Sequence, residues 1–77
     1  MKLTIESTTK IIDLVVGMNR VPARVWEGHT DSGIPVHCFI TRVAVGNEQD
    51  QSQFEAELRR CRQPSPEVAA IPLKFII

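Results

Sequence analysis

The central part of the sequence constrains the possible fold most strongly. Two stretches suited to β-strands, about Arg20 to Thr30 and about Ile34 to Val45, flank the short polar segment Asp31-Ser32-Gly33. Three-residue hairpin loops are usually a type I turn followed by a residue in the left-handed backbone region, which glycine adopts without steric cost. The sequence therefore predicts a β-hairpin in which Thr30 pairs with Ile34.

Counting outward from this loop gives the register of the predicted hairpin. The expected cross-strand pairs are Glu27–His37, Trp26–Cys38, Val25–Phe39 and Arg24–Ile40. Side chains alternate between the two faces of a strand, so one face carries Trp26, Val36, Cys38 and Ile40. The other face carries Val21, Ala23, Val25, Phe39 and Val43. One short helix cannot cover two apolar faces, and we therefore expect the protein to be a homo-oligomer.

The residues before the hairpin predict one further strand. Residues 2–7 alternate between polar and apolar side chains, and residues 10–16 are rich in β-branched side chains that continue or restart the same strand. Gly17-Met18-Asn19 follows, and glycine and asparagine both tolerate the positive φ angles of a turn. This segment therefore predicts the turn that leads into the hairpin.

The second half of the sequence predicts one amphipathic helix. Ser52 and Glu55 have the spacing of a capping box, in which each side chain bonds the backbone N–H of the other residue. Phe54, Leu58 and Cys61 then recur at the spacing of one apolar helical stripe. The opposite, charged face would carry Glu57, Arg59, Arg60 and Arg62.

The segment Pro64-Ser65-Pro66 predicts the end of this helix, because proline cannot continue a helix and restricts the residue before it. Residues 71–77 are mainly apolar and predict a closing strand. The expected element order is β-β-β-α-β. We therefore predict one α+β domain, residues 1–77, with a small, mainly antiparallel sheet and one amphipathic helix.

Composition and charge exclude several classes of function. A chain of 77 residues buries only about 60% of its unfolded surface, which is a second reason to expect an oligomer. Nine basic residues balance nine acidic ones, whereas proteins that bind nucleic acid backbone usually carry a basic excess. We expect no general DNA or RNA binding, but a small anionic ligand needs only two or three arginines.

We expect no targeting signal in this sequence. The first residues are not followed by the apolar stretch of a signal peptide, and no run is long enough to span a bilayer. We therefore expect a soluble cytoplasmic protein with reduced cysteines and no membrane partner.

The residue types that could support catalysis or metal binding are poorly arranged. His29, His37, Cys38 and Cys61 could bind zinc, but they do not form the short-spaced pairs of structural metal sites. His37 and Cys38 are neighbours in a strand and therefore leave opposite faces. The Glu27–His37 pair is the best acid–base candidate, and we interpret it as a surface charge pair. We predict no enzymatic activity, no catalytic residue, no metal and no cofactor.

Ligand binding fits the hairpin better. Arg24 and Trp26 share one face, and Thr41 and Arg42 lie nearby, with His37 as an outside candidate. A guanidinium binds phosphate through two hydrogen bonds, and an indole stacks on a nucleobase. The alternative interpretation is that Trp26 packs in the core of a small domain and Arg24 is a surface residue.

Most of the sequence resembles a group of small accessory proteins of phages and prophages of proteobacteria. The similar segments are IESTTK, PARVWEG, SGIPVHCFITRVAV, QFEAELRR and PSPEVAAIP, followed by an apolar C-terminal tail. Such proteins often counter the immune systems of the host by stoichiometric binding. The resemblance thus implies an anti-defence protein that acts in the host cytoplasm.

Three functions remain open from the sequence. The first is sequestration of a cyclic nucleotide immune signal by an oligomer, with contacts from Arg24, Trp26, His37, Thr41 and Arg42. The second is anti-CRISPR-like inhibition by direct binding to a host defence protein complex. The third is a structural or assembly role in the phage, in which the hairpin only folds the domain.

Overall fold

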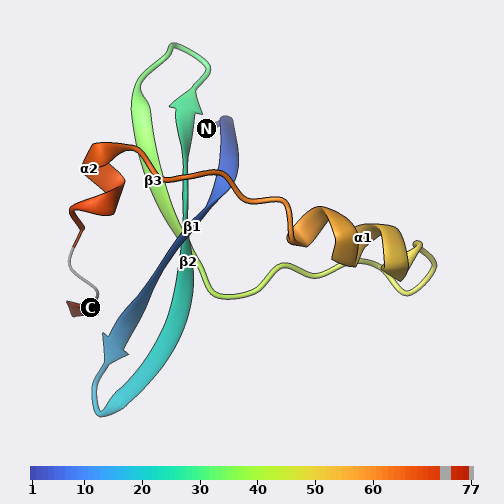
Figure 1. The fold of residues 1–77 in the computed structure, drawn as a ribbon, viewed down its shortest axis with the longest axis horizontal. Coiled ribbons are helices and arrows are strands. Elements are labelled where there is room, and N and C mark those ends of the chain that lie inside the picture. The colour runs from blue at the N-terminus through green and yellow to red at the C-terminus, as the bar shows by residue number, and fades with distance from the viewer. Residues whose placement is uncertain (72–73, 77) are drawn as a thin grey trace.

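The computed structural model describes residues 1–71 and 74–76, which combine a small sheet with two short helices (Figure 1). The elements are β1 (Leu3–Val16), β2 (Asn19–Thr30), β3 (Pro35–Ile40), α1 (Gln51–Leu58), α2 (Pro66–Ala69) and β4 (Lys74–Ile76). The strands lie in the order β3-β2-β1-β4, with both β1–β2 and β2–β3 antiparallel and β4 parallel to β1. The fold is thus α+β with a mainly antiparallel sheet. Of the closing strand expected at residues 71–77, β4 is present, and residues 72, 73 and 77 lie outside the described residues.

The β2–β3 hairpin has the predicted register. The pairs Glu27–His37, Trp26–Cys38, Val25–Phe39 and Arg24–Ile40 are all present. In the loop, the Thr30 N–H donates to the Ile34 carbonyl at 2.9 Å and the Gly33 N–H donates to the Thr30 carbonyl at 2.9 Å. Gly33 has a φ of 90°, as a glycine that closes such a loop requires.

The prediction that the third strand reaches Val45 is wrong, since β3 ends at Ile40. Thr30 is hydrogen-bonded across the loop to Ile34, and hydrogen-bonded pairs recur at every second residue of an antiparallel ladder. After the pair Arg24–Ile40, the next hydrogen-bonded pair would therefore be Pro22–Arg42. Proline has no N–H to donate. The ladder therefore stops before this pair, and the chain leaves the sheet at residue 41.

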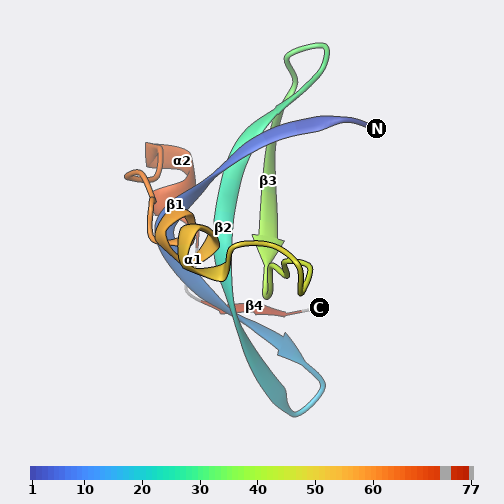
Figure 2. The ribbon, with the colours of Figure 1, turned by 90° about the vertical axis from the view of Figure 1, so that its right-hand side faces the viewer.

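The β1–β2 hairpin has a two-residue loop, Gly17-Met18, between the paired residues Val16 and Asn19. The φ of Gly17 is 61°, which fits the glycine at the first central position of a type II′ turn. The two long strands, β1 and β2, are strongly twisted about each other, as Figures 1 and 2 show. Near the start of β1, where Gly28 pairs with Ile5, the glycine leaves room for the β1 backbone: a Cβ at this position would lie 1.8 Å from the Thr4 carbonyl oxygen.

The two strand segments predicted before the hairpin form one strand with an irregularity between Ser7 and Ile11. Thr8 is fully buried there, and its Oγ1 donates to the Val25 carbonyl at 2.6 Å. The backbone of Arg62 lies beside this irregularity: its N–H donates to Ser7 O at 3.2 Å, and its carbonyl accepts from Thr9 N at 3.0 Å. The late part of the chain is therefore bound to the edge of β1.

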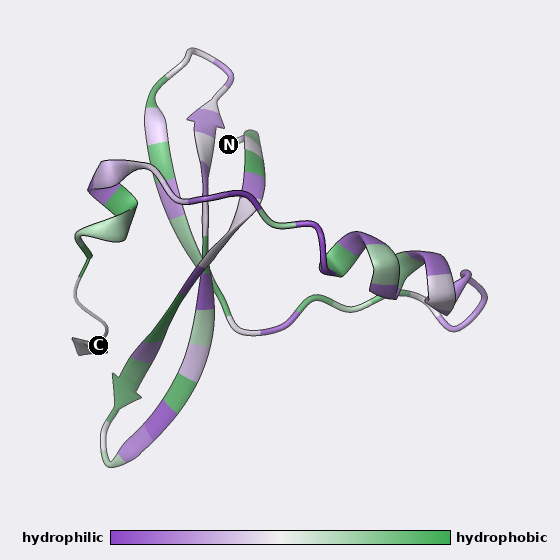
Figure 3. Cartoon of the chain, viewed as in Figure 1, coloured by the Kyte–Doolittle hydropathy of each residue, from purple (hydrophilic) through white to green (hydrophobic). Residues whose placement is uncertain are grey.

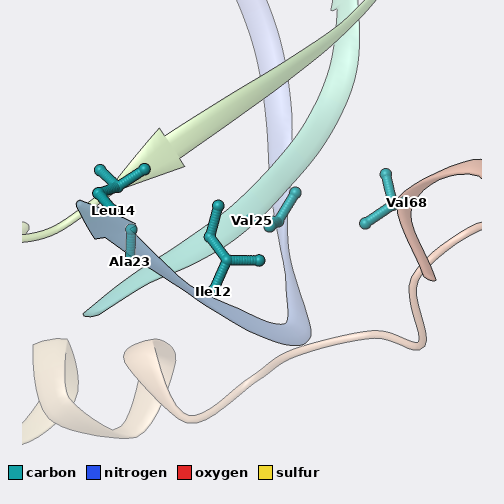
Figure 4. Close-up of a cluster of buried hydrophobic side chains, with 5 residues drawn as sticks. All are labelled: Ile12, Leu14, Ala23, Val25 and Val68. Carbon is teal, nitrogen blue, oxygen red and sulfur yellow. The ribbon is translucent and has the colours of Figure 1, made fainter. Parts of the chain in front are cut away.

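The core lies on one face of the sheet (Figure 4) and is formed by five apolar side chains. They are Ile12, Leu14, Ala23, Val25 and Val68. Val68 comes from α2 and points toward the strands, so α2 covers this face. Apolar and polar residues alternate along the paired strands, as a sheet with one buried face requires (Figure 3).

The sequence prediction did not include α2. Pro64-Ser65-Pro66 was expected only to end a helix, but Ser65 is the N-cap of α2 and Pro66 is in its first turn. The Ser65 Oγ accepts the Val68 N–H at 3.3 Å. Proline suits this position because the first N–H groups of a helix have no partner within the helix and the φ of proline is already helical.

The bounds predicted for the amphipathic helix are also wrong. The N-cap is Asp50 rather than Ser52, and its Oδ1 accepts the N–H groups of Ser52 at 2.9 Å and Gln53 at 3.2 Å. The helix ends at Leu58, so Cys61 is not part of its stripe and Arg59, Arg60 and Arg62 form no helical face. Pairing of Arg62 with β1 and the hydrogen bond from Ser7 Oγ to Arg60 O, at 2.9 Å, attach this segment to the edge of β1 instead. No helix among the described residues has both the length and the apolar character needed to cross a membrane.

Candidate functional site

Four of the five predicted ligand-binding residues line one hollow. Arg24, Trp26, Thr41 and Arg42 surround it together with Ile40, Val43 and Leu58, and its volume is about 150 Å³. Arg24 and Trp26 reach it because they alternate on the face of β2 that also carries their partners Ile40 and Cys38. Thr41 and Arg42 reach it because β3 ends at Ile40 and the chain turns away across this face. We call this space the arginine hollow.

His37 is not part of this hollow. It pairs with Glu27 in the hairpin and therefore leaves the sheet on the face opposite Trp26. It lines a separate hollow of about 380 Å³ beside Ser65 and the first turn of α2. The alternation of side chains along the strand thus separates His37 from the other four predicted site residues.

Arg24 is held in place by the irregularity of β1. Its Nη1 donates to the Thr8 carbonyl at 2.7 Å, and the residue is half-buried. A guanidinium has five N–H donors, so this bond leaves others to face the hollow. The side chain is consequently ordered before any ligand binds, which lowers the entropic cost of binding.

Arg42 contributes a second guanidinium and is exposed. Within residues 1–71, whose side chains the structure describes, the Arg42 side chain makes no hydrogen bond or ion pair. No carboxylate belongs to the described residues that line the arginine hollow. The hollow therefore offers two positive charges without a competing negative one, which suits a phosphate group.

Trp26 connects the arginine hollow to a longer groove. A middle hollow of about 170 Å³ lies between Trp26 and α1 and shares Val43 and Leu58 with the arginine hollow. A wide hollow of about 570 Å³ continues from it and shares Ser7 and Glu57. Trp26 lines all three hollows, so we call them together the Trp26 groove.

Helix α1 lies beside the predicted site, a position that the sequence does not predict. The sequence predicts that Phe54 and Leu58 belong to one apolar stripe, yet α1 has no buried residue and stands out from the sheet (Figure 1). Instead, Phe54 and Leu58 line the middle hollow opposite Trp26. The apolar stripe correctly indicates a contact surface on the helix, but the spacing of its residues does not tell which part of the protein faces that surface.

Glu27 has a structural role on the other face. Its Oε2 accepts the Ser65 N–H at 2.9 Å, and its Oε1 lies 3.3 Å from the Arg62 Nη2. The hydrogen bond from the Ser65 backbone, with a further contribution from the Arg62 charge, lowers the pKa of the Glu27 carboxyl below its ordinary value. One carboxylate oxygen therefore contacts the N-cap of α2 and the other contacts Arg62, and Glu27 binds these groups rather than His37.

The described residues contain no group of three or more His, Cys, Asp or Glu side chains that could hold a metal ion. Cys38 and Cys61 are free thiols, both half-buried. Comparison with known proteins adds no family: no protein family, curated protein or solved structure matches the chain.

Proposed function

We propose that the protein is a homo-oligomeric, phage-type accessory protein that binds a nucleotide stoichiometrically and so sequesters a cyclic nucleotide immune signal in the host cytoplasm. The observation that carries the proposal is the convergence of Arg24, Trp26, Thr41 and Arg42 on one hollow. Guanidinium groups suit the phosphate and the indole suits the base. The cyclic form of the ligand and its immune role follow from the resemblance to phage proteins.

The size of the hollow limits how such a ligand would bind. Sites for ligands of drug size usually measure about 300–1,000 Å³, and the arginine hollow measures about 150 Å³. It is large enough for a phosphate group alone. The base and sugar would therefore lie farther along the Trp26 groove, and a second copy of the chain would cover the open side.

Arg42 gives the sharpest test, because its side chain makes no hydrogen bond or ion pair within residues 1–71. Binding of cyclic mono-, di- and oligonucleotides to the purified protein is measured by thermal shift and calorimetry. We expect a rise in Tm for at least one ligand, and a loss of affinity of about tenfold or more in Arg42→Ala, as for a hydrogen bond to a charged group.

Arg59→Ala is the matched control, since Arg59 is an exposed arginine that lines none of the three hollows of the groove. This variant should bind as the wild type does. The absence of a Tm shift across the whole ligand panel would contradict the proposal. Equal losses of affinity in both variants would show that only overall charge matters.

Direct inhibition of a host defence protein complex, as by anti-CRISPR proteins, is the second candidate. The position of α1 favours it, because the helix buries no side chain and leaves Leu58 39% exposed, with Val43 43% exposed nearby. Short helices depend on tertiary packing for most of their stability. Under this function the protein would co-purify with a host complex, and Leu58→Asp would abolish the association without any effect of nucleotides.

A further inference from the structure

The two ends of the Trp26 groove differ in chemistry. At one end, the arginine hollow carries guanidinium groups and no carboxylate among its described lining residues. At the other end, the wide hollow carries the carboxylates of Glu6 and Glu57 beside the guanidinium groups of Arg60 and Arg62. An anionic group of a ligand therefore fits best at Arg24 and Arg42, where no described lining residue carries a carboxylate.

The two carboxylates of the wide hollow are not equivalent. Glu6 Oε2 lies 3.6 Å from Arg62 Nε, so its charge is already balanced by an arginine that also binds Glu27. The Glu57 side chain has no hydrogen bond or ion pair to any residue that the structure describes. Glu57 also lines the middle hollow, which places it next to Trp26 in the groove.

The position of Glu57 is set by the end of α1. The Arg60 N–H donates to the Glu57 carbonyl at 3.1 Å, and the segment that follows is bound to β1 through Arg62. The base of the Glu57 side chain is thus fixed relative to the sheet that carries Trp26. The Glu57 carboxylate offers two acceptor oxygens and no donor.

We infer that Glu57 selects the base of the nucleotide and that the preferred base is guanine; this inference rests on the proposed function. With the phosphate at Arg24 and Arg42 and the base stacked on Trp26, the hydrogen-bonding edge of the base faces Glu57. Guanine presents a ring N–H next to an exocyclic amino group, two parallel donors that match both oxygens of a carboxylate. The other bases place an acceptor beside their donor, and a carboxylate repels an acceptor.

The experiment compares cyclic guanosine monophosphate with cyclic inosine monophosphate by calorimetry. These ligands differ only in the exocyclic amino group, so phosphate binding and stacking are the same in both. We expect the wild type to bind the guanine ligand about tenfold more tightly, the low end for a hydrogen bond to a charged acceptor in an open site. In Glu57→Gln this preference should be lost, while Glu55→Gln, on the same helix but outside the groove, should keep it.

The outcomes separate this inference from the proposed function. Equal affinity of the wild type for both ligands, or an unchanged preference in Glu57→Gln, overturns the role of Glu57 but leaves nucleotide binding intact. If neither ligand nor any other nucleotide binds, both the proposed function and this inference are wrong. If Arg42→Ala weakens both ligands equally and Glu57→Gln weakens the guanine ligand more than the inosine ligand, both are supported.

Discussion

Removal of the Glu27 carboxylate tests how the sheet is joined to the segment that leads into α2. The side chain is 12% exposed and binds the Ser65 N–H at 2.9 Å and Arg62 at 3.3 Å. Through these contacts the sheet is connected to the N-cap of α2, the helix that covers the core. Glu27→Gln keeps an acceptor oxygen but removes the charge, and Glu27→Ala removes both.

The expected cost follows from the kinds of bond that change. A hydrogen bond to a charged acceptor contributes about 1.5–3 kcal/mol to stability and a neutral one about 0.5–1.5 kcal/mol. Through the weaker bond to Ser65, Glu27→Gln should therefore lower the free energy of unfolding by about 1 kcal/mol. The ion pair with Arg62 adds at most about 1 kcal/mol, because the Arg62 side chain is 42% exposed. Glu27→Ala should cost about 2–4 kcal/mol, since it also leaves the Ser65 N–H without its acceptor. This is a large share of the free energy of unfolding of a small domain, about 5 kcal/mol.

The pH dependence gives an independent check. The pKa of Glu27 is lowered in the folded protein, so its contribution to stability is fully present above the pKa of the unfolded chain, about 4.3 for glutamate. The contribution is lost as the pH falls through the lower pKa of the folded state. Urea unfolding should therefore show a gap between the wild type and Glu27→Gln at neutral pH that narrows on acidification.

Glu48→Gln serves as the control, because Glu48 is exposed in the loop before α1. This variant should match the wild type at neutral pH. A gap between the wild type and Glu27→Gln that stays constant from neutral to acidic pH would refute the reasoning, since it would show that charge on Glu27 does not contribute. Equal stability of all three proteins would refute it as well.

Two further predictions concern packing. Gly28→Ala should lower the free energy of unfolding by about 1–3 kcal/mol or more, because its Cβ would lie 1.8 Å from the Thr4 carbonyl oxygen and the β1 backbone must shift. A Tm equal to that of the wild type would contradict this close approach. Val68→Ala should cost about 1.5–3 kcal/mol, because Val68 is fully buried and loses two buried methyl groups. Chemical denaturation measures this loss of stability. The variant Ala69→Gly, at an exposed position of the same helix, measures the effect of helix propensity by itself.

The helix and strand ends that the sequence did not predict correctly have particular physical causes. Asp50 and Ser52 are both good N-cap residues and lie two positions apart, so propensity alone does not choose between them. Pro66 can end one helix or begin another, and only the burial of Val68 decides for the second. The end of β3 was readable in principle, because Pro22 falls at a position that must donate to the next strand.

The sequence by itself determined the β2–β3 hairpin, its register and therefore the face on which each of its side chains lies. These features depend on a short loop and on a two-residue period, which are local properties of the chain. They already place Arg24 with Trp26 and separate both from His37. Ala23 and Val25, which the register places together on one apolar face, are both buried.

Only the tertiary structure decided which segments meet these faces. The pairing of Arg62 with β1, the binding of Ser65 by Glu27 and the approach of Leu58 to Trp26 join residues far apart in the chain. Such contacts have no periodic signal, because each forms when the gain from burial and hydrogen bonding exceeds the entropy lost on closing a long loop. That balance depends on the whole folded chain, so the Trp26 groove became visible only in three dimensions.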